Sequence, residues 1–244
     1  MIRFVIITAP RTGSNYLCSL LNSHPLILCH HEIFNPKGIH YAIDHREGQI
    51  DLGTLQERAM NPAAFVQRVW DTSLHYRYVG FKLGWRQPEA AFESIYADPQ
   101  VKVILLSRRN RLKMYVSEQV ALAEGRWTHY HVPTAQLPPI KVEIDVEHFF
   151  EYTNTIDEFF QGVIQRLQGR GRGYKTLFYE DLFSVETEAE ILDFLGLQQL
   201  SQPLQAASVK RNPNNLRQIV TNFEQLEREL ACSRYASELT DRGL

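Results

Sequence analysis

Short runs of apolar, β-branched and aromatic residues recur along the chain and predict buried strands. Between them lie segments in which apolar positions recur at helical spacing. The strands are expected at 4–8, 78–83, 101–107 and 174–179. The helices are expected at 14–23, 62–76, 111–124, 146–167, 186–195 and 215–230. This alternation predicts the α/β class, with three α/β/α layers and a mainly parallel sheet.

Length and charge narrow the picture further. The chain has 244 residues, of which 44% are hydrophobic and 22% charged, so we expect one packed domain spanning 1–244. The formal net charge is only −2, which argues against nucleic acid as a partner. Any anion that the protein binds must therefore be held by a local cluster of cations.

The cysteines and the N-terminus indicate a compartment. Cys18, Cys29 and Cys232 are odd in number and form no CxxC pair, which disfavours a disulfide scaffold or a cysteine zinc site and fits a reducing environment. The apolar run that opens the chain is too short for a signal peptide or a membrane span, and no other stretch reaches spanning length. We therefore expect a cytoplasmic protein without a membrane span.

The loop after the first expected strand has the features of an anion site. It runs through Arg11, Thr12, Gly13, Ser14 and Asn15 into the first expected helix. Backbone N–H groups at such a helix start attract phosphate, and an arginine fork suits phosphate oxygens. The strand–turn–helix order is P-loop-like. The alternative is structural: Ser14 caps the helix and Arg11 forms a surface ion pair.

The loop is not a Walker A sequence, because GxxxxGK[ST] is absent. A strand-end aspartate for magnesium is also missing, and the strand at 101–107 runs instead into Arg108 and Arg109. Arginines there would serve a second anion rather than a metal ion. Both observations count against a metal-dependent small-molecule kinase, which is kept as an alternative together with a non-catalytic nucleotide-binding module.

Four segments in order resemble motifs of the sulfotransferases that use 3′-phosphoadenosine 5′-phosphosulfate (PAPS). The segment 10–14 is similar to the family's 5′-phosphosulfate loop, and Arg109 precedes Ser117 by the family's eight residues. Tyr179 begins a YEDL element, and Lys210 and Arg211 stand where a basic loop closes over the nucleotide. Taken together, the four segments are most similar to the bacterial branch that includes trehalose sulfotransferase. They also resemble the carbohydrate sulfotransferases.

The resemblance implies a PAPS donor whose 3′-phosphate is held by Arg109 and Ser117. It also implies donor contacts from the loop that carries Arg11 and from the other matched segments. Two departures stand out. The family's RKG motif is only approximated by Lys210 and Arg211, and Gly84 occupies the slot where aryl-type members carry a histidine base.

The missing histidine directs attention to other proton acceptors. In the bacterial and carbohydrate branches a glutamate at about this point is the base, and Glu32 follows Arg11 by 21 residues. His31 is the alternative, because imidazole titrates near neutrality. Lys82 could neutralise the phosphosulfate beside Arg11, or it could be a surface lysine with a buried stem. A metal site is not expected, since adjacent histidines on an extended segment point opposite ways.

The expected reaction is in-line sulfuryl transfer without a metal, in which the protein positions groups and stabilises charge. The acceptor is expected to be a small molecule, of a sugar or glycolipid type. We expect residues 33–75 and 125–145 to shape its pocket. Side chains that could stack on a sugar or aryl ring are Trp85, Trp127, Tyr130 and His131, although aromatic residues in loops equally often only pack. If neither Glu32 nor His31 is the base, His129 and His131 are the next candidates.

Overall fold

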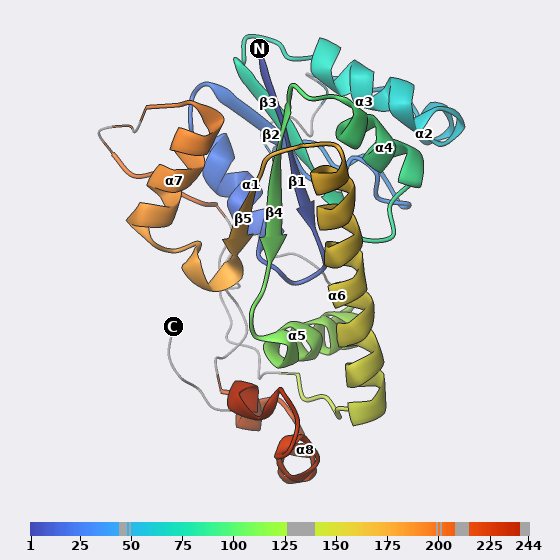
Figure 1. The fold of residues 1–244 in the computed structure, drawn as a ribbon, viewed down its shortest axis with the longest axis vertical. Coiled ribbons are helices and arrows are strands. Elements are labelled where there is room, and N and C mark those ends of the chain that lie inside the picture. The colour runs from blue at the N-terminus through green and yellow to red at the C-terminus, as the bar shows by residue number, and fades with distance from the viewer. Residues whose placement is uncertain are drawn as a thin grey trace.

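A parallel five-stranded sheet forms the centre of the computed structural model (Figure 1). The structure describes residues 1–43, 48, 50–125, 140–198, 200, 202–207 and 215–239. The strand order is β2-β3-β1-β4-β5, and every neighbouring pair is parallel. The strands are β1 (Ile2–Thr8), β2 (Ile27–His30), β3 (Tyr78–Gly84), β4 (Val101–Ser107) and β5 (Tyr174–Phe178). The predicted parallel sheet is confirmed.

Helices cover both faces of this sheet, as the three-layer prediction required (Figure 1). One face carries α1 (Ser14–Asn22) and α7 (Val185–Leu195). The other face carries α3 (Pro62–Asp71), α4 (Glu89–Ala97) and the long α6 (Val146–Gly169), with the short α2 (Leu55–Met60) beside α3. The remaining helices, α5 (Arg111–Glu124) and α8 (Phe223–Leu230), lie beyond the carboxyl ends of the strands.

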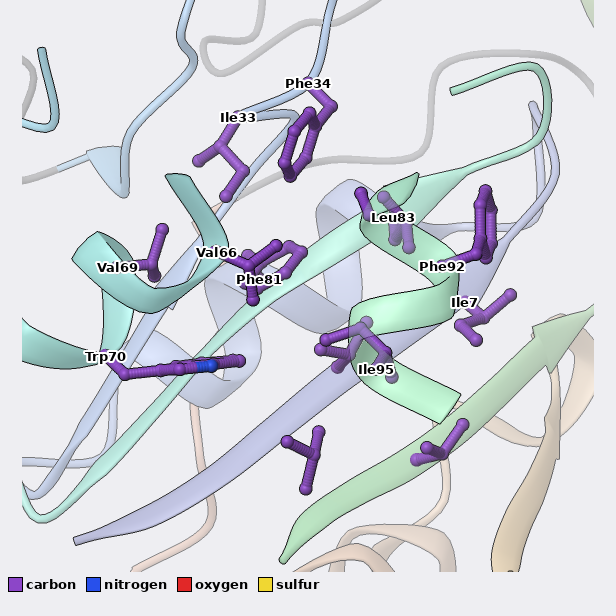
Figure 2. Close-up of a cluster of buried hydrophobic side chains, with 14 of the residues drawn as sticks. Ile7, Ile33, Phe34, Val66, Val69, Trp70, Phe81, Leu83, Phe92 and Ile95 are labelled. Atoms are coloured by element: carbon purple, nitrogen blue, oxygen red, sulfur yellow. The ribbon is translucent and has the colours of Figure 1, made fainter. Parts of the chain in front are cut away.

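The alternation of side chains along the strands explains the two buried layers. Ile7, Phe81 and Leu83 pack with Trp70 of α3 and Ile95 of α4 in one cluster (Figure 2). The neighbouring strand residues, among them Phe4 and Ile6, point the other way and pack against α1 and α7. Burying such a side chain contributes roughly 1.5–3 kcal/mol each, so both faces stabilise the sheet.

A third cluster packs α5 against α6 and α8. Phe149 of α6 contacts Tyr115 of α5 and Tyr235 after α8, with ring centroids 5.6 and 4.9 Å apart. Leu112, Phe149 and Leu226 are fully shielded from solvent. This cluster fixes α5 at the edge of the sheet where the strands end.

Four elements differ from the predicted pattern. The short β2, α2 and α4 were not predicted, because four to nine residues give too little periodicity. The single helix predicted at 215–230 is interrupted, and α8 begins only at Phe223. Val220 pairs with Val142 instead, and the Asn222 side chain bonds the backbone of Ile144 at both N and O. No described helix has the length and apolar character that crossing a bilayer requires.

Candidate active site

The loop between β1 and α1 lies at the centre of the edge where the parallel strands end. Arg11 and Gly13 both have left-handed backbone, with φ of 60° and 79°. Thr12 is buried, and its hydroxyl bonds Thr8 Oγ1 and the Ala9 carbonyl. Gly13 is the N-cap of α1 and supplies no side-chain hydrogen bond to the first turn. The N-terminus of α1 therefore keeps the character of an anion site, and the capping alternative for Ser14 is not what the structure shows.

Gly13 also allows a close approach of two segments. A Cβ atom built there would lie 2.5 Å from Cδ2 of Tyr179. A side chain at this position would meet both a strained φ and the tyrosine ring. The glycine therefore lets Tyr179, from the end of β5, pack on the loop.

On the β3 side of the loop, Lys82 joins the predicted residues. Its ammonium lies 2.5 Å from Asn15 Oδ1, 3.3 Å from Ser14 Oγ and 2.8 Å from Glu32 Oε1. The other oxygen of Glu32 accepts a hydrogen bond of 2.6 Å from Asn35. Burial alone would raise the pKa of Glu32, but Lys82 and Asn35 hold it below its usual range. Glu32 is therefore an ionised carboxylate at neutral pH.

Both candidate bases lie beside this group, in different surroundings. His31 is buried, with Nδ1 3.2 Å from Asn15 Oδ1, whereas the Glu32 side chain keeps 36% exposure. An incoming acceptor can reach the exposed carboxylate more easily than the buried ring. The segment after Glu32 is held by Arg58 of α2, which donates to the carbonyls of Ile33 and Gly38 at 2.6 and 3.1 Å.

On the β4 side of the loop, the charges are mainly positive. Arg11 Nε donates to Ser117 Oγ of α5 at 2.9 Å, which joins two predicted donor-binding residues. Arg108 donates to the Arg11 carbonyl at 3.3 Å, and its guanidinium lies 4.5 Å from the centre of the Tyr179 ring. Burial lowers the pKa of both arginines. Burial raises the pKa of Glu118, and the positive charge of Arg11 offsets part of that rise.

Arg109 lies apart from this group. Its guanidinium forms two hydrogen bonds to Asp181 at 2.7 and 2.6 Å, and half of its side chain is exposed. Glu180 accepts from the backbone N–H groups of Arg109 and Asn110. The YEDL segment (179–182) is thus hydrogen-bonded to the turn after β4. The structure does not bring Arg109 and Ser117 together, and their shared role toward the 3′-phosphate stays a prediction.

Several of the remaining predicted residues cannot be placed in the site. Lys210, Arg211, Trp127, His129, Tyr130 and His131 lie outside the described residues. Trp85 packs edge-on against Tyr152, with centroids 6.3 Å apart, and the Arg86 guanidinium lies 4.0 Å from the centre of the Trp85 ring. Within the described ranges, no group of three potential ligands could hold a metal ion. Arg108 is predicted only together with Arg109, as a strand-end arginine suited to a second anion, and the motif is assigned to Arg109 alone.

Known proteins resemble the chain along nearly its full length. No family model matches the sequence. Nodulation protein H of Rhizobium meliloti strain 1021 is 27% identical over 238 residues, which are 96% of this chain and 93% of that protein. The protein of the same name from Rhizobium tropici is 28% identical over 247 residues, 98% of this chain and 94% of its own. This similarity agrees with the resemblance that the sequence motifs indicated. The predicted resemblance to sulfotransferases is confirmed.

A solved structure is also similar. The crystal structure of a sulfotransferase from Alicyclobacillus acidocaldarius is 17% identical in sequence, with a TM-score of 0.48. The match covers 100% of this chain and 97% of that one.

Proposed function

We propose that this sulfotransferase moves a sulfuryl group from PAPS to a hydroxyl or amine of a small, carbohydrate-type acceptor. The observation that carries the proposal is the placement of Lys82, paired with Glu32, beside a helix start that also holds Arg11. Cations and helix amides suit an anionic donor, and a carboxylate next to them suits an acceptor that must lose a proton.

The residues present fit the phosphosulfate end of such a donor. The first turn of α1 receives no side-chain cap, so its N–H groups can face phosphate oxygens. Arg11 and Lys82 approach this turn from opposite sides, one bonded to Ser117 and the other to Asn15. Opposed cations balance charge on both sides of a transferring group.

The proposed step is an in-line displacement. The acceptor oxygen or nitrogen forms a bond to sulfur while the bond between sulfur and the bridging phosphate oxygen breaks. The acceptor's proton passes to Glu32, and adenosine 3′,5′-bisphosphate leaves with the negative charge. Lys82 and Arg11 stabilise that charge, and the protein forms no covalent bond in the step.

Lys82 links donor binding to the basicity of Glu32. Without a donor, the ammonium is shared among Glu32, Asn15 and Ser14. A phosphosulfate beside α1 competes for the same ammonium, which weakens its hold on the carboxylate. The pKa of Glu32 then rises from its lowered value, so the base becomes stronger when the donor is in place.

The acceptor proposal rests on the position of Glu32. The carboxylate is followed by the segment that Arg58 holds, so residues 33–75 are proposed to shape the acceptor pocket, together with 125–145. A sugar or glycolipid with several hydroxyls is the proposed class. We propose that the enzyme works in the cytoplasm, in line with its three free thiols at Cys18, Cys29 and Cys232.

Turnover with ³⁵S-labelled PAPS and a panel of mono- and disaccharides tests this function. Labelled, acceptor-dependent product is the expected result. Binding of adenosine 3′,5′-bisphosphate in a thermal-shift assay, without turnover of any acceptor, would instead favour the non-catalytic nucleotide-binding module. Activity should also survive EDTA, because the proposed scheme uses only protein cations. Loss in EDTA with recovery in magnesium would favour the kinase alternative.

A further inference from the structure

We propose that Arg86, stacked on the ring of Trp85, binds an anionic group of the acceptor, so that the acceptor is an acidic sugar with a carboxylate or a phosphoester. This inference rests on the proposed sulfuryl transfer to a carbohydrate-type acceptor. Arg86 lies on the turn that directly follows β3, the strand that carries Lys82. The turn is held beside the β1–α1 loop, because the Trp85 N–H donates to the Thr8 carbonyl at 2.9 Å. Arg86 is therefore part of the sheet edge where the chemistry is proposed.

The backbone of Arg86 is unusual for an arginine. Its φ is 66°, in the left-handed region that favours glycine and asparagine. The turn is closed by Gln87, whose N–H donates to the Gly84 carbonyl at 3.1 Å and whose side chain accepts from the Gly84 N–H at 2.9 Å. Residues that their surroundings hold in such a conformation cluster at ligand-binding sites. The turn therefore fixes the direction in which the Arg86 side chain leaves the backbone.

The contact with Trp85 holds the guanidinium but leaves its donors available. The Arg86 guanidinium lies 4.0 Å from the centre of the Trp85 ring, and the ring itself packs edge-on against Tyr152 of α6. A guanidinium this close to a ring centre contacts the ring with its face, so its N–H groups point outward in its own plane. Arg86 is exposed, and a carboxylate or phosphate can reach this fork of donors.

The charge of Arg86 is not balanced within the described ranges. Its guanidinium forms neither an ion pair nor a hydrogen bond there. Glu118 of α5 lies close enough for both Arg86 and Arg11 to lower its pKa, although burial raises that pKa more. One carboxylate near two guanidinium groups leaves a net positive charge, which attracts an anion to the exposed member, Arg86.

The sheet order favours the acceptor over the donor as the source of this anion. Arg86 follows β3, and Glu32, the proposed base, follows β2 on the same side of β1. The residues that the motifs assign to the nucleotide include Arg109 and Tyr179, which follow β4 and β5 on the other side. The acceptor must reach Glu32 to lose its proton, so a second group of the same molecule can contact Arg86. A sugar with an anionic substituent beside its free hydroxyls has both features.

A purely structural role for Arg86 has a different signature. The side chain could serve only to cover the Trp85 ring. Loss of that cover would lower the stability of the free protein and would affect neutral and charged acceptors alike. Loss of an anion contact lowers the rate with charged acceptors selectively.

Rates of ³⁵S transfer from labelled PAPS to matched sugars separate these roles. Methyl glucuronide and methyl glucuronamide share one ring and differ by one negative charge, and methyl glucoside 6-phosphate distinguishes a phosphoester from a carboxylate. The value of kcat/KM for each sugar is measured in the parent, Arg86→Asn, Arg86→Lys and Arg170→Asn, together with the thermal midpoint of each free protein.

The variants are matched to the turn and to the charge. Asparagine tolerates a left-handed φ, so Arg86→Asn removes the charge without adding backbone strain. Arg170 is also exposed and lies 5.7 Å from the centre of the Tyr96 ring, but it follows α6 at the opposite edge of the sheet. Arg170→Asn therefore controls for the loss of one exposed arginine beside a ring.

We expect the parent to favour methyl glucuronide or the 6-phosphate over the glucuronamide by about five- to twentyfold in kcat/KM, as for one charge-assisted contact at an exposed site. Arg86→Asn should lose most of this preference, with a far larger fall for the charged sugars than for the glucuronamide. Arg86→Lys should keep part of it, and Arg170→Asn should behave like the parent.

Three results overturn the inference: equal rates for charged and neutral sugars in the parent, a preference that survives in Arg86→Asn, or equal losses for all sugars with a lowered midpoint. Turnover of neutral sugars alone also overturns it and leaves the proposed function intact. If the parent sulfates no acceptor, neutral or charged, the proposed function itself fails.

Discussion

The two sides of the β1–α1 loop differ in how their charges are balanced. On the β3 side, Lys82 is matched by Glu32 at 2.8 Å and is almost fully buried. On the β4 side, Arg11 and Arg108 lie close together, and Arg108 forms no ion pair within the described part of the chain. The balanced side suits proton transfer, which needs a carboxylate held in place. The unbalanced side suits tight retention of an anion.

The largest effect is expected from Glu32→Gln, which tests the balanced side. The amide keeps the size but cannot accept the acceptor's proton, so kcat should fall by about 10²–10⁴-fold. Affinity for adenosine 3′,5′-bisphosphate should stay within a few-fold, because a carboxylate contributes nothing favourable to holding an anion. Single-turnover kinetics and calorimetry measure the two quantities.

The matched control is His31→Asn. His31 shares Asn15 with Lys82 but is buried, so this change should cost much less activity. A nearly active Glu32→Gln together with an inactive His31→Asn would reverse the two roles. If both variants are active, the base has to be sought in 125–145, with His129 and His131 the next residues to change.

Lys82→Met should lower turnover by about ten- to a hundredfold and also move the pH profile. Activity requires ionised Glu32 and is lost as pH falls through its pKa. That pKa lies below the usual range because Lys82 and Asn35 outweigh burial. Without Lys82, burial dominates and the pKa rises, so the acid limb of kcat/KM should move to higher pH. An acid limb that stays in place would show that Glu32 does not set it.

Gly13→Ala should disturb both sides at once. The new Cβ would lie 2.5 Å from the Tyr179 ring. The backbone φ of 79° is also strained for alanine. We expect the free energy of unfolding to drop by about 1–3 kcal/mol, together with weaker nucleotide binding. Denaturant titration measures the first effect. Gly125→Ala is the matched control, since its φ of 66° is similar and nothing lies within 4 Å of the new Cβ. Equal losses in both variants would show that the contact with Tyr179 is unimportant.

The smallest effect is expected from Asp181→Asn. The pair that it forms with Arg109 is largely exposed, with side-chain exposures of 44% and 51%. Such pairs contribute at most about 1 kcal/mol, and the variant should be destabilised by no more than that. Added salt should shrink the difference from the parent in denaturant titrations. A loss well beyond this range would mean that Arg109 supports the site through Asp181 far more than an exposed pair can.

The sequence predicted the sheet better than it predicted the partners within the site. Buried runs such as 101–107 identify strands directly, and the glycine turn at Gly13 identifies the anion loop. The pairing of Lys82 with Glu32 depends on β2 lying beside β3, and β2 has only four residues. A strand that short leaves no periodic signal.

The partner of Arg109 could not be predicted from sequence spacing for a related reason. Consecutive residues after a strand point in different directions, and the direction of Arg109 is fixed by Asp181, 72 residues further along the chain. Spacing within one motif contains no information on such a distant carboxylate. The eight-residue interval to Ser117 therefore predicts a shared role for Arg109 and Ser117 but not the direction of the Arg109 side chain.

The anchoring of the Glu32 segment by Arg58 has a consequence for how this enzyme can diversify. The buried guanidinium holds Ile33 and Gly38 from a helix that contributes none of the described contacts around Arg11. Under the acceptor role proposed for 33–75, exposed positions of this segment can vary while the β1–α1 loop stays unchanged. A library that randomises those positions and keeps Arg58 should yield enzymes with altered acceptor preference from one inherited donor site. New specificities can then arise without rebuilding the catalyst.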